Sequence, residues 1–231
     1  MGTSEPRPAD GSQTLERGLR ALRLIAGAPH GMTATELAGE LGVHRSVAYR
    51  LLTSLVRQHF AVRDDEARYR VGADLVGLAE QVRPRLREVA EQVLRRLADE
   101  LEATACLVVR DDDAAVAVTV VEPATRGPRF SYRVGNRDPL DRGAAGIALL
   151  AGGPPADGEP ARVTEARERG YALTAGEVVP GTFAVAAPIR TTHPDGPAGI
   201  NLITHRQDIA EAAVAPVTAA AEEISARLLH H

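Results

Sequence analysis

The 231-residue sequence predicts an α+β protein with two domains, because three kinds of hydrophobic pattern follow one another along the chain. Residues 14–73 contain three segments with helical spacing and then two short β-like stretches. Residues 74–102 carry a long amphipathic stripe, and residues 103–231 contain apolar strands with helices at both ends. Such an arrangement predicts an antiparallel sheet covered by helices in the second domain.

The first two helices are predicted from their spacing and their end signals. The first begins near Thr14 and ends at Gly27. The second is preceded by T-A-T-E, a capping box in which Glu36 can reach back to Thr33, and it ends at Gly42. Apolar residues recur at helical spacing in the first helix: Leu15, Leu19, Leu22 and Ile25.

A third helix is predicted over residues 44–58, with an apolar inner side and a polar outer side. Two short β-like stretches, 60–63 and 68–71, follow it and are joined by a turn at 64–67. Three helices followed by a hairpin is the order of a winged helix-turn-helix, which we place at residues 14–73. The apolar inner side of the third helix is formed by Val47, Leu51, Leu55 and Val56.

The outer side of the third helix has the chemistry that reads DNA. Residues 41–63 contain four arginines and no acidic residue. Arg45 and Arg50 lie near the helix start, where a recognition helix meets base edges, and a guanidinium can bond both O6 and N7 of guanine. Arg68 and Arg70 on the wing are expected to contact phosphate or the minor groove. The candidate DNA-binding residues are His44, Arg45, Ser46, Tyr49, Arg50, Thr53, Arg57, Arg68 and Arg70.

A basic helix face has a second interpretation, because most charge runs are solvated surfaces. The capping box, the glycine turn, the apolar inner side and the hairpin occur in the correct order, and together they favour DNA binding. The net charge of −4 argues against a protein coated in nucleic acid, but it leaves room for a small local DNA-reading surface.

Residues 74–102 are predicted to form linker helices, interrupted at Pro84, and the second domain follows at residues 103–231. A domain of this size argues against an architectural DNA-binding protein without ligand control. Strands are expected in this domain at 105–110, 116–121, 130–134, 183–189 and 198–204, and helices at 142–151 and 208–229.

Composition places the chain among soluble globular proteins, with 44% hydrophobic and 25% charged residues. No apolar run approaches the roughly 18–20 residues that a membrane span needs, so we expect no membrane partner. Residues 1–13 are polar and contain proline and glycine, which predicts a disordered tail and neither a signal peptide nor an anchor. These observations predict a cytoplasmic protein.

Cysteine and histidine usage argues against metal and redox chemistry. Cys106 is the only cysteine, so an intrachain disulfide is impossible and a cysteine-rich zinc site is not expected. It stands in an apolar stretch, where we expect a small buried hydrophobe. The seven histidines are scattered without metal-ligand spacing. We therefore expect no metal and no cofactor.

An enzyme is the competing functional class. Acyl transfer requires a nucleophile beside a base, and phosphate chemistry requires a Gly-rich cradle or carboxylates that hold a metal. Neither arrangement is visible in the sequence, and we predict that the protein is not an enzyme. Serine and histidine partners that are distant in sequence keep the alternative open.

Long stretches of the chain resemble the IclR family of bacterial regulators. The segment that begins TLERGLRALRLIAGAPHG and ends VGADLVGLA resembles the family's N-terminal half. RVGNRDPLDRGAAGIALLA and ERGYALTAGEVVPGTFAVAAPI, followed by AGINLIT, resemble its effector-binding domain. The resemblance covers about residues 14–229, with the two halves in the family's order.

This resemblance implies a winged helix-turn-helix joined by a linker helix to an effector-binding domain with a GAF-like fold. It also implies dimerisation through the DNA-binding domains, frequent tetramers through the effector domains, and a palindromic DNA operator. Most members are repressors, and their ligands are typically small carboxylates, aromatic acids or related metabolites.

The resemblance also implies where a small-molecule effector binds. The implied effector-binding residues are Phe130, Asp138, Ala144, Ala145, Thr174, Thr182, Ala184, Asn201 and Ile203. The family commonly has different residues at several pocket positions. It has histidine where this chain has Asp141, lysine where it has Ile147, an acidic residue near Thr174, cysteine where it has Ala184, and small hydroxyl residues where it has Asn201 and Ile203. A larger or more neutral ligand than glyoxylate or pyruvate, hydrogen-bonded by Asn201 and Thr174, is therefore expected. A degenerate pocket without a ligand is the alternative.

Together these observations predict a ligand-responsive transcriptional repressor that binds a palindromic operator as a homodimer or homotetramer. Its DNA affinity is expected to change when a small molecule binds the C-terminal domain. An enzyme, and a ligand-independent DNA-binding protein with a degenerate pocket, are the alternative interpretations.

Overall fold

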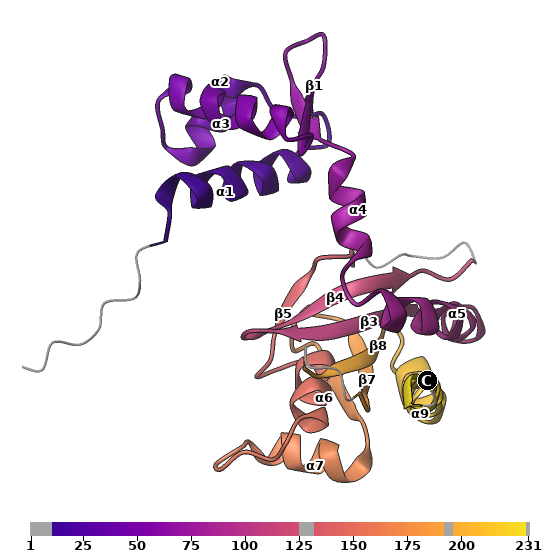
Figure 1. The fold of residues 1–231 in the computed structure, drawn as a ribbon. Coiled ribbons are helices and arrows are strands. Elements are labelled where there is room, and N and C mark those ends of the chain that lie inside the picture. The colour runs from indigo at the N-terminus through magenta and orange to yellow at the C-terminus, as the bar shows by residue number, and fades with distance from the viewer. Residues whose placement is uncertain (1–10, 125–131, 192–195, 230–231) are drawn as a thin grey trace, which may run out of the picture. The chain divides into compact units, whose positions relative to one another are not determined.

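The computed structural model describes residues 11–124, 132–191 and 196–229 and is shown in Figure 1. The chain divides into two compact units, Met1–Val82 and Arg83–His231. Among the described residues, no helix combines the length and the apolar character needed to cross a membrane.

The first unit is a winged helix-turn-helix, as predicted (Figure 1). Its second helix has the predicted capping box: the Thr33 hydroxyl accepts from the Glu36 N–H, and the Glu36 carboxylate accepts from the Thr33 N–H. Gly42 ends this helix in the left-handed conformation at φ 65°. The elements are α1 (Gln13–Gly27), α2 (Ala34–Leu41), α3 (Arg45–Arg57), β1 (Ala61–Arg63), β2 (Tyr69–Val71) and α4 (Asp74–Glu80).

The core of the first unit uses only part of the apolar stripe that the spacing indicated on α1. Ala21 and Ile25 are buried together with Leu37 of α2 and Leu52 of α3. Leu15 and Leu19, however, are 62% and 50% exposed. Four apolar residues at helical spacing cover a wide angle, and within this unit only one edge of that stripe meets α2 and α3.

The second unit is a six-stranded antiparallel sheet in the order β5-β4-β3-β8-β7-β6, with helices on both faces. The expected strands at 183–189 and 198–204 are confirmed as β7 and β8. The elements are α5 (Pro84–Leu101), β3 (Thr104–Asp111), β4 (Ala114–Val121), β5 (Arg137–Pro139), α6 (Ala144–Gly152), α7 (Ala161–Arg169), β6 (Ala172–Ala175), β7 (Phe183–Ile189), β8 (Ala198–Thr204), α8 (Gln207–Ala212) and α9 (Val214–Leu229).

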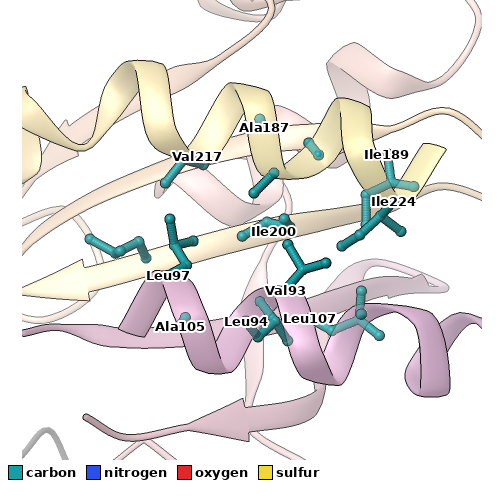
Figure 2. Packing of buried hydrophobic residues seen from close by; sticks show 14 of the residues in the cluster. Val93, Leu94, Leu97, Ala105, Leu107, Ala187, Ile189, Ile200, Val217 and Ile224 are labelled. Atoms are coloured by element: carbon teal, nitrogen blue, oxygen red, sulfur yellow. The ribbon is translucent and has the colours of Figure 1, made fainter. Parts of the chain in front are cut away.

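Helices α5 and α9 cover one face of the sheet, and Figure 2 shows side chains from both helices and from the strands gathered in one cluster. Val93 and Leu94 of α5 and Ile224 of α9 pack with Ile200 and Leu202 of β8. The amphipathic stripe at the C-terminal side of Pro84 is therefore part of the second unit's core. The opposite face carries Cys106, Val108 and Ile203 and packs against α6.

Several expectations for the second unit were wrong in detail. In the expected strand at 130–134, the described residues Tyr132–Val134 are not in a strand; the edge strand is β5, which pairs with β4 three residues further on. The closing helix expected at 208–229 is two helices, α8 and α9, separated at Ala213. Helix α7 and strand β6 lacked a clear pattern in the sequence because both are short.

Replacing Leu202 by Ala should destabilise the second unit by about 2–5 kcal/mol, because the fully buried side chain would leave a cavity between the sheet and α5. Equilibrium unfolding in denaturant measures this loss. Leu173→Ala is the matched control, since Leu173 in β6 is 43% exposed. Equal destabilisation by the two substitutions would contradict the assigned core.

Candidate nucleic-acid interface and ligand cavity

The outer face of α3 is a solvent-exposed polar surface. Its side chains alternate with the buried Ala48, Leu51 and Leu52, which hold the helix against α1 and α2. All the predicted DNA-binding residues of this helix and its N-cap are exposed: His44, Arg45, Ser46, Tyr49, Arg50, Thr53 and Arg57. The folded first unit therefore presents them together on one face.

The start of α3 is capped by a histidine. The His44 Nδ1 accepts from the Ser46 backbone N–H at 3.3 Å and lies 2.8 Å from the Ser46 Oγ. A side-chain acceptor at this position satisfies one of the free N–H groups of the first helical turn. His44 and Ser46 thus hold the N-terminal turn that carries Arg45.

Arg45, Arg50 and Arg57 have no carboxylate partner among the residues that the structure describes. Their guanidinium groups are available to an anionic ligand, with the fork geometry that suits phosphate and guanine. Tyr49, between them, is 53% exposed. The Thr53 hydroxyl donates to the Tyr49 carbonyl at 2.8 Å, so its oxygen is left to act as an acceptor.

The wing arginines have different roles in the fold. Arg68 donates to the Gly31 carbonyl at 3.0 Å and forms a two-point ion pair with Glu36 at 3.2 and 3.3 Å. Its guanidinium therefore joins the wing to the N-terminus of α2, a role that the sequence prediction of a phosphate contact missed. Arg70 is half exposed and contacts Asp64 at 3.4 Å.

Arg63 is an exposed basic residue of the wing that the site prediction omitted. It lies in β1 with its guanidinium carbon 6.0 Å from the centre of the Tyr69 ring. Tyr69 is buried in β2 and makes backbone hydrogen bonds to Met32 in both directions. The anchored Tyr69 ring thus lies within cation–π range of Arg63. The sequence signal that could have identified Arg63 is its place in residues 41–63, a segment without acidic residues.

The second unit contains a cavity between β5, β8 and the N-terminus of α6, closed by the loop before β7. Its volume is about 30 Å³, room for roughly two water molecules. Phe130 of the implied pocket lies outside the described residues. The structure brings the other implied residues together as lining of this cavity: Asp138, Ala144, Ala145, Thr174, Thr182, Ala184, Asn201 and Ile203.

Polar groups converge where α6 begins. The Gly143 N–H donates to the Glu177 Oε2 at 2.8 Å, and the Ala144 N–H donates to the Thr174 Oγ1 at 3.1 Å. Glu177 also pairs with Arg162 of α7. The sequence analysis missed several lining residues whose places depend on long-range contacts: Tyr132, Arg142, Gly143, Glu177, Val178 and Val179.

An aspartate shapes the electrostatics beside β5. The Tyr132 hydroxyl donates to the Asp138 Oδ2 at 2.6 Å. Burial, and then this hydrogen bond, raise the pKa of Tyr132, which keeps the phenol neutral. Burial raises the pKa of the Cys106 thiol, and the negative charge of Asp138 adds to it. The expectation that Cys106 is buried is confirmed.

The described residues contain no group of three or more His, Cys, Asp or Glu side chains placed to hold a metal ion. The lining of the cavity combines apolar walls with carboxylates and amide or hydroxyl groups.

Comparison with known proteins assigns both halves of the chain to one family. The family model for the IclR helix-turn-helix domain matches residues 14–65, and that for the bacterial transcriptional regulator IclR C-terminal domain matches residues 81–164. The transcriptional regulator BhcR of Paracoccus denitrificans is 31% identical over 83% of this chain and 77% of its own length. The transcriptional repressor IclR of Escherichia coli is 33% identical over 62% of this chain and 54% of its own length.

Solved structures share the fold over almost the whole chain. An IclR transcriptional regulator from Alicyclobacillus acidocaldarius has a TM-score of 0.76 and 26% identity, covering 94% of this chain and 99% of its own. An IclR homologue from Microbacterium hydrocarbonoxydans, solved in complex with 4-hydroxybenzoate, has a TM-score of 0.81 and 21% identity, covering 95% and 100% of the two chains.

The Arg68–Glu36 contact gives a testable prediction about the wing. Arg68→Ala and Glu36→Gln should each lower the thermal midpoint of the first unit, and the double variant should lose less than the sum. Glutamine keeps the capping box, so this cycle isolates the ion pair. Arg70→Ala is the control, because the Arg70 side chain is more exposed than that of Arg68 and its contact with Asp64 is longer, at 3.4 Å. Strict additivity would show that the two side chains are not coupled.

The same contact predicts a pH dependence. The Thr33 backbone N–H, and more weakly Arg68, hold the pKa of Glu36 below its usual range. Stability from the charged carboxylate is therefore complete above the ordinary glutamate pKa and is lost as the pH falls through the lowered value. Unfolding midpoints recorded across the acidic range should fall less steeply in Glu36→Gln than in the original chain.

Proposed function

Because this chain belongs to the IclR family of bacterial transcriptional regulators, we propose that it is a repressor that binds a palindromic operator and is controlled by a small-molecule effector. Its relatives BhcR and IclR are transcriptional regulators, and we assign this chain to the same class of DNA-binding proteins and not to the enzymes. The observation that carries the proposal is the exposed arginine face of α3, whose opposite side is fixed in the core.

Helix α3 is the proposed recognition helix. Arg45 and Arg50 lie in its first two turns, the part of a recognition helix that reaches base edges in the major groove. Arg57, at the last turn, and Arg70, on the wing, are proposed to contact phosphates. Arg68 is proposed to orient the wing through Glu36 rather than to bind DNA.

Dimerisation is proposed to occur through the DNA-binding domains. Leu15 and Leu19 form an exposed apolar edge on α1, and Val76 and Leu78 of α4 are 62% and 56% exposed. A second copy of the chain would bury these side chains together. A single exposed leucine on a monomer needs no explanation, but a group of exposed apolar side chains indicates an interaction surface. Such a dimer would present two α3 helices to half-sites about 34 Å, or a multiple of that distance, apart. Assembly into tetramers would use the second units.

The cavity beneath α6 is proposed to bind the effector. The relative solved with 4-hydroxybenzoate supports a small molecule as the ligand of this kind of domain. The effector would favour one arrangement of the linker helices at 74–102 and so change the separation of the two recognition helices. Because a ligand shifts such a balance only through its differential affinity, the effector must bind the two arrangements unequally. We place the regulator in the cytoplasm, where its operator is.

The recognition-helix proposal predicts that Arg45→Ala or Arg50→Ala costs about 1–3 kcal/mol of specific binding when that arginine grips a guanine. Fluorescence anisotropy, with an operator selected from random DNA by the full-length protein, measures the loss. Arg95→Ala on α5 is the control, because Arg95 is also exposed but lies in the second unit. Unchanged operator affinity would reject the assignment for the arginine tested.

The dimer proposal predicts that Leu15→Asp combined with Leu19→Asp lowers the molar mass of the protein in solution and weakens operator binding. Two charges on the apolar edge of α1 would have to be desolvated in the dimer. Light scattering without DNA measures the mass. Val62→Asp, on the 50% exposed wing position, should leave the mass unchanged. If the variant with both aspartates keeps the molar mass of the original protein, another surface holds the assembly together.

A further inference from the structure

Two of the N–H groups at the N-terminus of α6 are paired with the chain's own side chains. A helix N-terminus is the usual place for a ligand carboxylate, because free N–H groups point toward it. Here the Gly143 N–H is taken by the Glu177 carboxylate and the Ala144 N–H by the Thr174 hydroxyl. The Arg162 guanidinium pairs with the same Glu177. An incoming anion would have to displace these contacts to reach these two N–H groups.

The charges that line the cavity also disfavour an anion. Asp138 and Glu177 are both lining residues. Of the described lining residues, only Arg142 is basic, and its side chain is exposed. A ligand carboxylate would therefore enter a poorly hydrated space beside two carboxylates, where like charges repel more strongly than in water.

A buried acceptor in the cavity lacks a donor. Asn201 lies in the middle of β8, between Cys106 of β3 and Ala186 of β7 in register, and it is 3% exposed. Its Oδ1 is buried, and no donor among the described residues bonds to it. Because an unpaired buried acceptor is costly, a ligand that supplies an N–H or O–H group would gain this interaction fully. Asp138 offers a second acceptor, since the Tyr132 hydroxyl occupies only its Oδ2.

The outer wall of the cavity can yield to a ligand larger than the present volume. Val178 and Val179 form part of this wall and are already 39% and 44% exposed. Because these side chains are already partly in solvent, moving them outward costs less burial than moving the inner wall, which is fixed in the sheet by the pairing of β8 with β3 and β7. The fixed side of the cavity is thus the side that carries Asn201.

We propose that the effector is an uncharged or cationic molecule whose N–H or O–H donors pair with Asn201 and Asp138. This inference rests on the function proposed above. Asp138 and Glu177 disfavour a carboxylate by charge, and the Gly143 and Ala144 N–H groups that could bind one are already paired. This ligand class would set the chain apart from the relative solved with 4-hydroxybenzoate.

Three probes of nearly the same shape and different charge test the proposal: benzamide, benzamidine and benzoate. Their affinities for the full-length protein are measured by ligand-observed NMR titration without DNA. Benzamide and benzamidine should bind at least about tenfold more tightly than benzoate, the ratio expected when one buried hydrogen bond is gained or lost. Benzoate binding as tightly as the other two, or no binding by any probe, overturns the proposal.

Substitutions at Asn201 test whether its amide causes the preference for uncharged or cationic probes. Asn201→Leu keeps the branching and the number of side-chain heavy atoms and removes the amide, so benzamide should lose at least about tenfold in affinity. Asn136→Leu, at the other asparagine and outside the cavity lining, is the matched control and should not change it. Asn201→Asp keeps the shape and adds charge, so the preference for benzamidine over benzamide should rise about tenfold. Should Asn201→Leu fail to fold, this charge variant still decides, and an unchanged preference overturns the proposal.

The titrations contain no DNA, so they separate this inference from the regulator function. Operator binding by the apo protein together with tighter benzoate binding would overturn only the ligand class. A protein that prefers benzamide but binds no operator would instead overturn the proposed function and leave the assigned chemistry of the cavity intact.

Discussion

Strand β8 is the constraint on which the second unit depends. All seven of its residues are buried, and it pairs with β3 on one side and β7 on the other. Because side chains alternate along a strand, Ile200 and Leu202 enter the core with α5 and α9, while Asn201 and Ile203 line the cavity on the opposite face. A shift of one residue would exchange core and cavity. The packing that stabilises this unit therefore also fixes the inner wall of its ligand site.

Helix α3 combines two functions in the same way. Its apolar side is held by α1 and α2, and this contact fixes the direction in which Arg45 and Arg50 project. A rigid element is the best support for a recognition surface, since base contacts require defined geometry. The wing is held separately: Arg68 joins it to Glu36 of the α2 capping box, so one carboxylate serves both the helix start and the hairpin. The first unit thus uses one of its wing arginines for structure and leaves others exposed.

Much of the fold followed from local sequence signals, and these have a clear physical origin. The capping box at Thr33, the glycine at 42 and the continuous apolar runs of β7 and β8 act within a few residues, so the sequence alone could predict them. The cavity positions followed from a family resemblance, which carries over residues that lie far apart in the chain. The described members of that set do line one cavity.

The sequence by itself determined the order of the domains, the two-sided character of α3 and the stripe on α5. Only the tertiary structure decided which polar side chains remain available to a ligand. Arg68 meets Glu36 across 32 positions, and Gly143 meets Glu177 across 34. Likewise, Leu15 has the spacing of a core residue but is 62% exposed in the folded unit. Periodicity reports which faces are apolar, whereas pairing and exposure depend on contacts that only the folded chain brings together.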